Sequence, residues 1–364
     1  MKKNAIVYCE NEFGKIDGKV ANGLVRHSEK YNIIGIIDST KLGLDAGEYL
    51  DGVKNGIPIF STIDIAMDYL NPTPEYFIYG IAPLESFLDQ KQREVFFTAM
   101  KRGLNIINGM AEYFTDDLEF VQKAKESNVK IIDIRKPHPR KKLPHFSGRI
   151  FDIDIPVITV LGTDCAVGKR TTALHLIKAL TQKGLKAIFV STGQTGVMQG
   201  AKYGVPIDVL SSGYATGAVE NAVVNAYENE NPDIIIVEGQ GALSHPAFLS
   251  SCAIIKGAQP DAIILQHSPK RKKRCDYPEI AMPILANEIK QLEVFSNSKV
   301  IAITINHENM TAPELVETIR TYEMKYQRLT TDILKYGCNK LVKELLNIFP
   351  SLKKQSSKIH QLQE

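Results

Sequence analysis

The segment 156–180 carries the residues best suited to chemistry, PVITVLGTDCAVGKRTTALHLIKAL, in which an apolar strand leads through a glycine-bounded loop into a helix. Backbone N–H groups of such a loop, the helix N-terminus and the Lys169 ammonium together suit a phosphate. Five residues separate Gly162 from Gly168, one more than in the common form of this motif. We therefore predict a phosphate-binding loop with cofactor-binding residues Gly162, Thr163, Asp164, Cys165, Ala166, Val167, Gly168, Lys169, Arg170 and Thr171.

The residue after the lysine departs from the usual motif. A Ser or Thr hydroxyl commonly holds magnesium there, whereas this chain has Arg170, and Thr171 comes one place late. An arginine adds positive charge where a metal would sit. Two alternatives follow: the loop binds a pyrophosphate with little or no magnesium, or Thr171 shifts to hold the metal.

A second informative stretch is IIIVEGQG at 234–241. Its apolar strand delivers Glu238 to the carboxyl edge of a sheet, and the glycines after it let a backbone or ligand pass closely. In a nucleotide-hydrolysing enzyme this carboxylate would order magnesium or water. The alternative is that Glu238 only caps the next helix.

Composition describes an ordinary globular chain of 364 residues, with 44% hydrophobic residues and a net charge of +3. This charge is too small to predict nucleic-acid or membrane binding. The N-terminus turns polar too soon for a signal peptide, and no apolar run is long enough to cross a bilayer. The five cysteines lack C-x-x-C spacing, so they suggest neither a zinc site nor a disulfide framework. We expect a cytoplasmic protein, with a homo-oligomer left open.

Short β-branched runs alternate with helical patterns along the chain, which predicts an α/β protein with two doubly wound parallel sheets, the first Rossmann-like and the second of the P-loop type. The predicted division is a Rossmann-like domain at 1–132, a linker at 133–156, a P-loop domain at 157–349 and a polar tail at 350–364. In the first domain Asp38 ends the second predicted strand, where an acidic residue can hold a ribose. The first turn lacks G-x-G-x-x-G, which favours a scaffold in which Asp38 only ends a strand.

Predicted strands of the first domain are 5–8, 33–37, 76–79, 104–107 and 129–134, and those of the second are 157–160, 186–190, 207–210, 234–237, 262–265 and 300–305. Predicted helices of the second domain are 170–182, 215–228 and 280–292, with an amphipathic closing helix over 331–349.

Two cationic segments have competing interpretations. The Pro-rich linker places Arg135 close behind a strand end, where it either receives an anionic ligand or is merely solvated. The run from Lys270 to Arg274 is either a solvated loop or a grip on phosphate or an acidic substrate. We predict Arg271, Arg135 and the glycine-flanked Gln194 as substrate-binding residues, although the turn at Gln194 has an alternative as a turn alone.

The P-loop segment resembles the dethiobiotin synthetase branch of P-loop proteins. The resemblance rests on Gly162-Thr163-Asp164, Val167-Gly168-Lys169, Val237-Glu238-Gly239 and, ending a later strand, Asn306. In that branch this asparagine reads adenine, which adds Asn306 to the cofactor-binding residues.

Nearly the whole chain is similar to a prokaryotic family, formerly of unknown function, that joins an N-terminal Rossmann-like domain to a C-terminal P-loop domain. This resemblance rests on GTDCAVGKRTTA, STGQTG at 191–196, His245-Pro246, and GAQPD at 257–261 leading to His267. Some members are D-glutamate N-acetyltransferases that use acetyl-CoA. The resemblance implies an N-acetyltransferase acting on a small amino acid such as D-glutamate.

Acetyl transfer fits the residues, because coenzyme A carries phosphates and its acyl transfer needs no metal. A base must free the amine lone pair, and the candidates at strand ends are Glu238, His245 and His267. An ATP-dependent ligase of the dethiobiotin synthetase type is the alternative, with magnesium near Asp164, Thr171 and Glu238. A nucleotide-binding protein without turnover is the third possibility.

Overall fold

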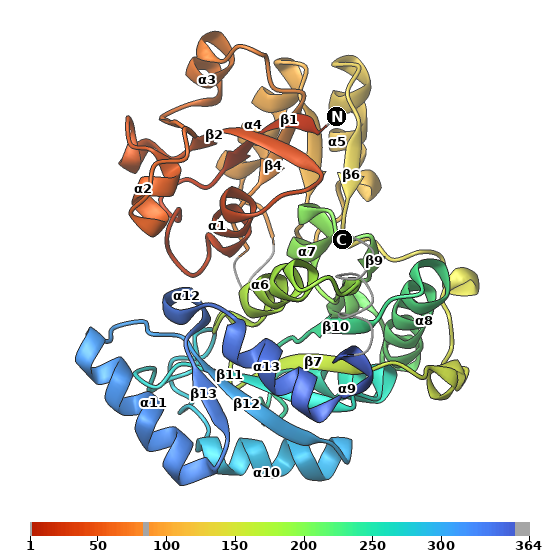
Figure 1. Cartoon of the computed structure of the whole chain (residues 1–364). Coiled ribbons are helices and arrows are strands. Elements are labelled where there is room, and N and C mark those ends of the chain that lie inside the picture. Colours follow the sequence, from red (N-terminus) through yellow and green to blue (C-terminus); the bar gives the residue numbers. More distant parts are fainter. Residues whose placement is uncertain (1, 83–86, 354–364) are drawn as a thin grey trace, which may run out of the picture. The chain divides into compact units, whose positions relative to one another are not determined.

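The computed structural model describes residues 2–82 and 87–353 (Figure 1). Contacts divide the chain into two compact units, one of Met1–His138 with Gln194–Ala201 and the other of Pro139–Gly193 with Lys202–Glu364. From Pro139 onward, the predicted linker is counted with the second unit. There the Ser147 N–H donates to Glu220 of helix α8 (Ser212–Glu230) at 2.6 Å.

The first unit contains a parallel sheet of six strands in the order β3-β2-β1-β4-β5-β6, the Rossmann order. Its strands are β1 (Lys3–Tyr8), β2 (Tyr31–Ile37), β3 (Ile59–Phe60), β4 (Tyr76–Tyr79), β5 (Asn105–Asn108) and β6 (Ile131–Asp133). Its helices are α1 (Lys19–Arg26), α2 (Ala46–Asp51), α3 (Ile63–Tyr69), α4 (Gln90–Lys101), α5 (Leu118–Glu126) and α7 (Gln194–Gln199). The predicted fold class is thus confirmed for this unit; β3, with two residues, was not predicted.

The second unit contains a parallel sheet of seven strands in the order β13-β12-β11-β7-β10-β8-β9. Its strands are β7 (Val157–Gly162), β8 (Ala187–Ser191), β9 (Tyr203–Gly204), β10 (Ile234–Glu238), β11 (Ala262–His267), β12 (Lys299–Ile305) and β13 (Leu329–Thr331). Its helices are α6 (Lys169–Gln182), α8 (Ser212–Glu230), α9 (Ser250–Ala258), α10 (Leu285–Ser296), α11 (Ala312–Tyr326), α12 (Ile333–Tyr336) and α13 (Asn339–Ile348). The predicted α/β architecture is confirmed here too.

Strand β7, which leads into the predicted phosphate loop, is a central strand of this sheet. All its residues are buried, and it lies between β10 and β11. Alternate side chains enter different cores: Val157 and Leu161 join one apolar cluster, Ile158 and Val160 the other. The loop that follows β7 therefore starts from a central strand packed on both faces.

Two predicted elements of the second unit differ from the structure: one strand is absent, and one helix begins later than predicted. Residues Ile207–Val209 form a short 3-10 turn after Pro206, and the edge strand is instead β9. The helix predicted from Ile280 begins at Leu285, because the chain before it is held in extended pairing, with the Met282 N–H donating to Lys272 O at 2.9 Å.

The predicted closing helix is divided as well. Thr331 ends β13, and Gly337, with φ of 69°, separates α12 from α13. A left-handed backbone at this glycine stops the first helix. Of the predicted polar tail, residues 354–364 lie outside the described part.

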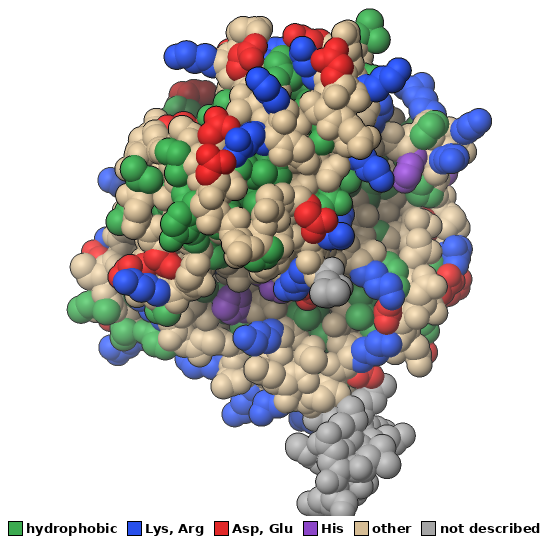
Figure 2. All heavy atoms as spheres, turned by 90° about the horizontal axis from the view of Figure 1, so that it is seen from above, with side chains coloured by type: hydrophobic (Ala, Val, Ile, Leu, Met, Phe, Trp, Pro, Cys, Tyr) green, Lys and Arg blue, Asp and Glu red, His purple; other side chains and the backbone are tan. Residues whose placement is uncertain are grey.

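Charged side chains of both signs are interspersed on the face drawn in Figure 2. This pattern agrees with the small net charge of +3. In the described ranges, every helix is too short or too polar to span a lipid bilayer.

Candidate functional site

The loop between β7 and α6 has the backbone of a phosphate cradle. Ala166 and Gly168 both have positive φ, 49° and 108°. At Gly162 an added Cβ would lie 2.9 Å from side-chain carbons of both Val167 and Lys169. Glycine is therefore needed at both ends of the loop, at one for its conformation and at the other for space.

Lys169, the first residue of α6, folds back onto the loop. Its Nζ donates to Asp164 O at 2.6 Å and to Gly241 O at 3.1 Å. Burial lowers the pKa of Lys169, because desolvation disfavours the charged form. The ammonium is thus held by backbone carbonyls, and an anion at the loop would favour its charge.

Arg170 lies against the acidic strand end. Its Nη1 is 3.7 Å from Glu238 Oε1, while Glu238 Oε2 accepts from Ser191 Oγ at 2.7 Å and from the Thr192 N–H at 3.2 Å. The carboxylate at the predicted magnesium position therefore faces a guanidinium and two protein donors. Such a set of neighbours does not suit magnesium, which prefers oxygen ligands with free lone pairs.

Arg271, from the basic run at 270–274, donates hydrogen bonds to three residues of the loop. It donates to Cys165 O at 2.7 Å, to Ala166 O at 3.3 Å and to Asp164 Oδ2 at 3.0 Å. Its other edge binds both oxygens of Glu308, at 2.7 and 2.9 Å. The run is therefore not simply solvated: Arg271 positions the loop, and its predicted contact with substrate stays a prediction.

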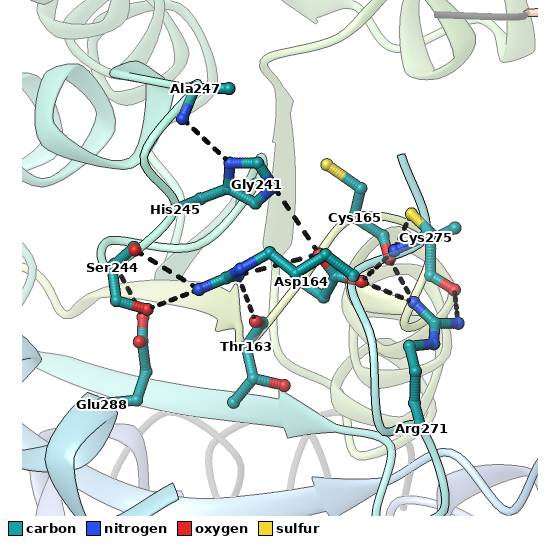
Figure 3. A network of polar contacts seen from close by, with 12 residues as sticks. Thr163, Asp164, Cys165, Gly241, Ser244, His245, Ala247, Arg271, Cys275 and Glu288 are labelled. Atoms are coloured by element: carbon teal, nitrogen blue, oxygen red, sulfur yellow. Dashed lines mark hydrogen bonds and ion pairs between the residues drawn. The ribbon is translucent and has the colours of Figure 1, made fainter. Parts of the chain in front are cut away.

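Arg274 extends this support to the inner side of the loop. It donates to Thr163 O at 3.0 Å and to Ser244 Oγ at 3.0 Å, and its Nη1 lies 3.8 Å from Asp164 Oδ1. Asp164 lies between His245 and Arg271 in the network of Figure 3. Two arginines and one aspartate thus fix the start of the loop.

His245 is a buried ring at this network, where it accepts one hydrogen bond. Its Nδ1 accepts from the Ala247 N–H at 3.2 Å, which places the proton of the neutral ring on Nε2, 4.0 Å from Asp164 Oδ1. Burial, together with the charge of Arg274, lowers the pKa of His245. Both facing atoms, His245 Nε2 and Asp164 Oδ1, are buried without a hydrogen bond to any described residue. Nε2 of the neutral ring is therefore arranged to donate a hydrogen bond to a ligand rather than to accept a proton.

His267 lies at the end of β11, behind the loop. Its Nδ1 is 2.9 Å from Thr163 Oγ1, and burial lowers its pKa to about 4, with a smaller contribution from the charge of Arg271. The ring is therefore neutral at pH 7 and connects the sheet edge to the loop. Asn306 follows β12, and its Oδ1 accepts from the Glu308 N–H at 3.0 Å.

The structure thus brings one group of the predicted residues together around the loop, and two others belong to the first unit. Glu238, His245, His267, Arg271 and Asn306 come from strand ends and loops of the second unit. Arg135 follows β6, and Gln194 begins α7; both are counted with the first unit. Their substrate-binding roles stay predictions, as do the catalytic roles of Glu238 and the two histidines.

Sequence reasoning missed two residues that shape the site. Glu308 anchors Arg271, and its only sequence signal is its place two residues after the strand-end Asn306. Arg274 was seen only as part of a basic run, since charge alone does not tell a buried arginine from a solvated one.

At the carboxyl edge of the first sheet, the acidic side chain is fully bonded within the protein. Asp38 is fully buried and accepts from Lys41 Nζ at 2.8 Å and Thr40 Oγ1 at 2.6 Å, and from the N–H groups of Asn11 and Phe13 at 3.2 and 3.3 Å. Both carboxylate oxygens are thus occupied by protein donors. The structure favours the interpretation in which Asp38 ends a strand and fixes the first turn.

Comparisons with known proteins agree with this architecture. Residues 144–342 match the family model described as "Domain of unknown function (DUF1611_C) P-loop domain", and residues 39–137 match the DUF1611_N Rossmann-like domain. A crystal structure of a DUF1611 family protein from Anabaena variabilis is similar with a TM-score of 0.86 and 26% identity, over 95% of this chain and 100% of that one.

Two curated relatives carry the name D-glutamate N-acetyltransferase. The one from a Pseudoalteromonas species is 28% identical and the one from Tritonibacter scottomollicae 26% identical, each over 74% of this chain and 80% of the relative. With both of its domain models matched and in this order, the chain belongs to the DUF1611 family of proteins with a Rossmann-like and a P-loop domain.

Proposed function

We propose that this protein is an N-acetyltransferase that transfers the acetyl group of acetyl-CoA to the amine of an amino acid such as D-glutamate, with the P-loop holding phosphates of the coenzyme. The observation that carries the choice of ligand is the contact between Arg170 and Glu238. It puts a built-in cation where a magnesium-dependent enzyme needs a metal ligand. The names of the curated relatives support the same reaction.

The residues of the loop fit a pyrophosphate. Its left-handed residues Ala166 and Gly168 curve the backbone, and Lys169 and Arg170 bring two cations to the start of α6. Charge-assisted hydrogen bonds from these groups would hold the phosphate oxygens without a metal.

The transfer itself requires three events at the acetyl group. The free amine attacks the thioester carbonyl carbon, the tetrahedral intermediate expels the coenzyme thiolate, and the proton of the attacking nitrogen passes to a base. Phosphates and acetyl group lie at opposite ends of the coenzyme, joined by its pantetheine arm. Residues that touch the loop are therefore closer to the phosphate end.

This geometry makes the role of Glu238 testable. As a base, it would act through Oε1, whose partner in the described structure is Arg170 at 3.7 Å. As a phosphate-end residue, it would only position Arg170. A Glu238→Gln variant separates the two roles, because loss of a base lowers kcat whereas loss of Arg170 positioning raises KM for acetyl-CoA.

The test of the proposed function is product formation. Purified protein is incubated with acetyl-CoA and D-glutamate, with L-glutamate as the matched control, and free coenzyme thiol and the N-acetyl product are measured. We expect both products from D-glutamate in the presence of EDTA. Binding of acetyl-CoA without either product, across a panel of D-amino acids, would contradict a transferase and favour a binding protein.

Formation of ADP from ATP and magnesium, with no acetylated product, would instead support the ligase alternative. In that case Thr171 and Glu238 would have to rearrange around the metal, since Arg170 now faces the carboxylate.

A further inference from the structure

Two cysteines meet at the phosphate loop. Cys165 is a loop residue, and Cys275 follows the basic run; Cys275 Sγ lies 3.5 Å from Cys165 O, and the Cys275 N–H donates to Asp164 Oδ2 at 2.9 Å. Figure 3 shows the two side chains as neighbours. We propose that Cys165 and Cys275 form a dithiol site that low-molecular-weight disulfides convert into an intramolecular disulfide, which closes the loop to phosphate ligands.

The two side chains are accessible enough to react. Both are partly exposed, whereas Cys9 and Cys338 are buried in apolar cores. Burial raises the pKa of Cys338 to about 12 and that of Cys9 further, which keeps both as unreactive thiols. The pair at the loop therefore differs from these two in exposure as well as in having a partner.

The surroundings shift the pKa values of the two thiols in opposite directions. A hydrogen bond from Cys275 lowers the pKa of Cys165, burial opposes this, and the Lys169 charge adds to the lowering. The same hydrogen bond, burial and the nearby Asp164 carboxylate raise the pKa of Cys275. Cys165 is thus the attacking thiolate, and Cys275 is the resolving thiol.

The reaction balances with a disulfide as the oxidant. The Cys165 thiolate attacks one sulfur of the small disulfide, its S–S bond breaks, and one small thiolate leaves. Cys275 then loses its proton to solvent and attacks Cys165 Sγ, which releases the second small thiolate. The protein loses two electrons and two protons overall, and the oxidant becomes two small thiols.

The new bond would distort the cradle. A disulfide draws the two sulfurs to about 2.05 Å, well inside the contact distance of two thiols. Once it is bonded to Cys165, Cys275 Sγ also loses the proton with which it contacts Cys165 O at 3.5 Å, and the link competes with the hydrogen bonds by which Arg271 holds Cys165 O and Ala166 O. Amide groups shifted from their phosphate-binding positions hold an anion less well. This inference rests on the phosphate loop and not on acetyl transfer.

The test oxidises the full-length protein with glutathione disulfide and maps its disulfides by mass spectrometry. Binding of inorganic pyrophosphate is measured by calorimetry before oxidation, after oxidation and after reduction with dithiothreitol. Cys252, partly exposed on α9 away from the loop sequence, provides the matched control Cys252→Ser.

We expect one Cys165–Cys275 link in the wild type and in Cys252→Ser, with pyrophosphate affinity reduced by roughly tenfold or more and restored by reduction. Cys275→Ser should stop at a mixed disulfide on Cys165, and Cys165→Ser should form no link. Absence of the Cys165–Cys275 link in the wild type, or equal pyrophosphate binding by reduced and oxidised protein, would overturn the proposal.

Discussion

The two sheets of this protein treat a buried lysine at the carboxyl edge in opposite ways. Lys41 of the first unit is 8% exposed and pairs with the Asp38 carboxylate at 2.8 Å. Lys169 of the second is 7% exposed, yet its Nζ donates to two backbone carbonyls and pairs with no carboxylate in the described structure. The charge of Lys41 is neutralised by a carboxylate and stabilises the fold. The charge of Lys169 contacts only carbonyl oxygens of the described residues, so it can still pair with a bound anion.

The aspartates at the two sheet edges, Asp38 and Asp164, also differ in how fully protein donors occupy their oxygens. The hydrogen bonds of Asp38 come from the turn after β1 and from the residues that follow Asp38 itself, and they occupy both oxygens. Asp164 receives Arg271 and the Cys275 N–H on Oδ2, while its Oδ1 has no hydrogen-bond partner among the described residues. The two parallel sheets are similar, but their carboxyl edges differ. In the first unit the edge carries a turn held by internal hydrogen bonds, and in the second it carries a binding loop supported by arginines.

The largest expected effect is on the stability of the first unit. Lys41→Ala should lower the free energy of unfolding by about 3–5 kcal/mol, because it leaves the Asp38 charge buried and unpaired. Thermal and urea unfolding measure this effect. Pyrophosphate affinity should stay unchanged if the first edge is purely structural.

Lys3→Ala is the matched control in the same sheet. Lys3 pairs with Glu75 at 3.0 Å, but its side chain is 56% exposed, so its loss should change the free energy of unfolding far less than Lys41→Ala does. Equal effects of the two substitutions would contradict a structural role for the Lys41–Asp38 pair.

A second difference should appear in the pH dependence of unfolding. The folded-state pKa of His267 is about 4 against an ordinary 6.5, so the unfolded chain takes up a proton at a higher pH than the folded one. The second unit should therefore lose up to about 3 kcal/mol as the pH falls from 6.5 to 4. His267→Gln should flatten this slope, and an unchanged slope would contradict the buried neutral ring.

The first unit should respond only at lower pH. Although burial opposes it, the hydrogen bonds from Lys41 and Thr40 lower the pKa of Asp38 below 3.8. The stability that this carboxylate contributes is present above that value and is lost as the pH falls through the folded pKa. Unfolding followed by probes in each unit would separate the two ranges.

The next effect concerns ligand binding. Lys169→Ala should weaken pyrophosphate binding by about 1.5–3 kcal/mol, the range for a hydrogen bond to a charged group. Titration calorimetry measures it, and Lys178→Ala, an exposed lysine on the same helix, is the control. Equal affinity of wild type and Lys169→Ala would contradict the phosphate-loop assignment.

The sequence predicted most of the fold because apolar strands alternate with helices along both halves. It predicted β4 to the residue, and it failed where local signals conflict, as at Ile207, whose apolar run follows a proline and forms a 3-10 turn. Short edge strands such as β3 and β9 carry too few residues to show a pattern.

The loop itself was predictable, because glycine spacing indicates its backbone shape and a lysine at the helix start indicates phosphate binding. The residues that hold the loop in place were not predictable. Arg274 and Glu308 act through contacts between segments distant in the sequence, and nothing in a basic run or a lone glutamate indicates that they converge on Asp164 and Arg271.

The most direct test of the central claim, that built-in cations replace a metal at the phosphate loop, is calorimetric titration with acetyl-CoA and separately with ATP, each with magnesium and with EDTA. The wild type should bind acetyl-CoA with the same affinity in both conditions and in preference to ATP, and Arg170→Thr should gain magnesium-dependent ATP binding. Wild-type binding of ATP alone, and only with magnesium, would contradict the claim.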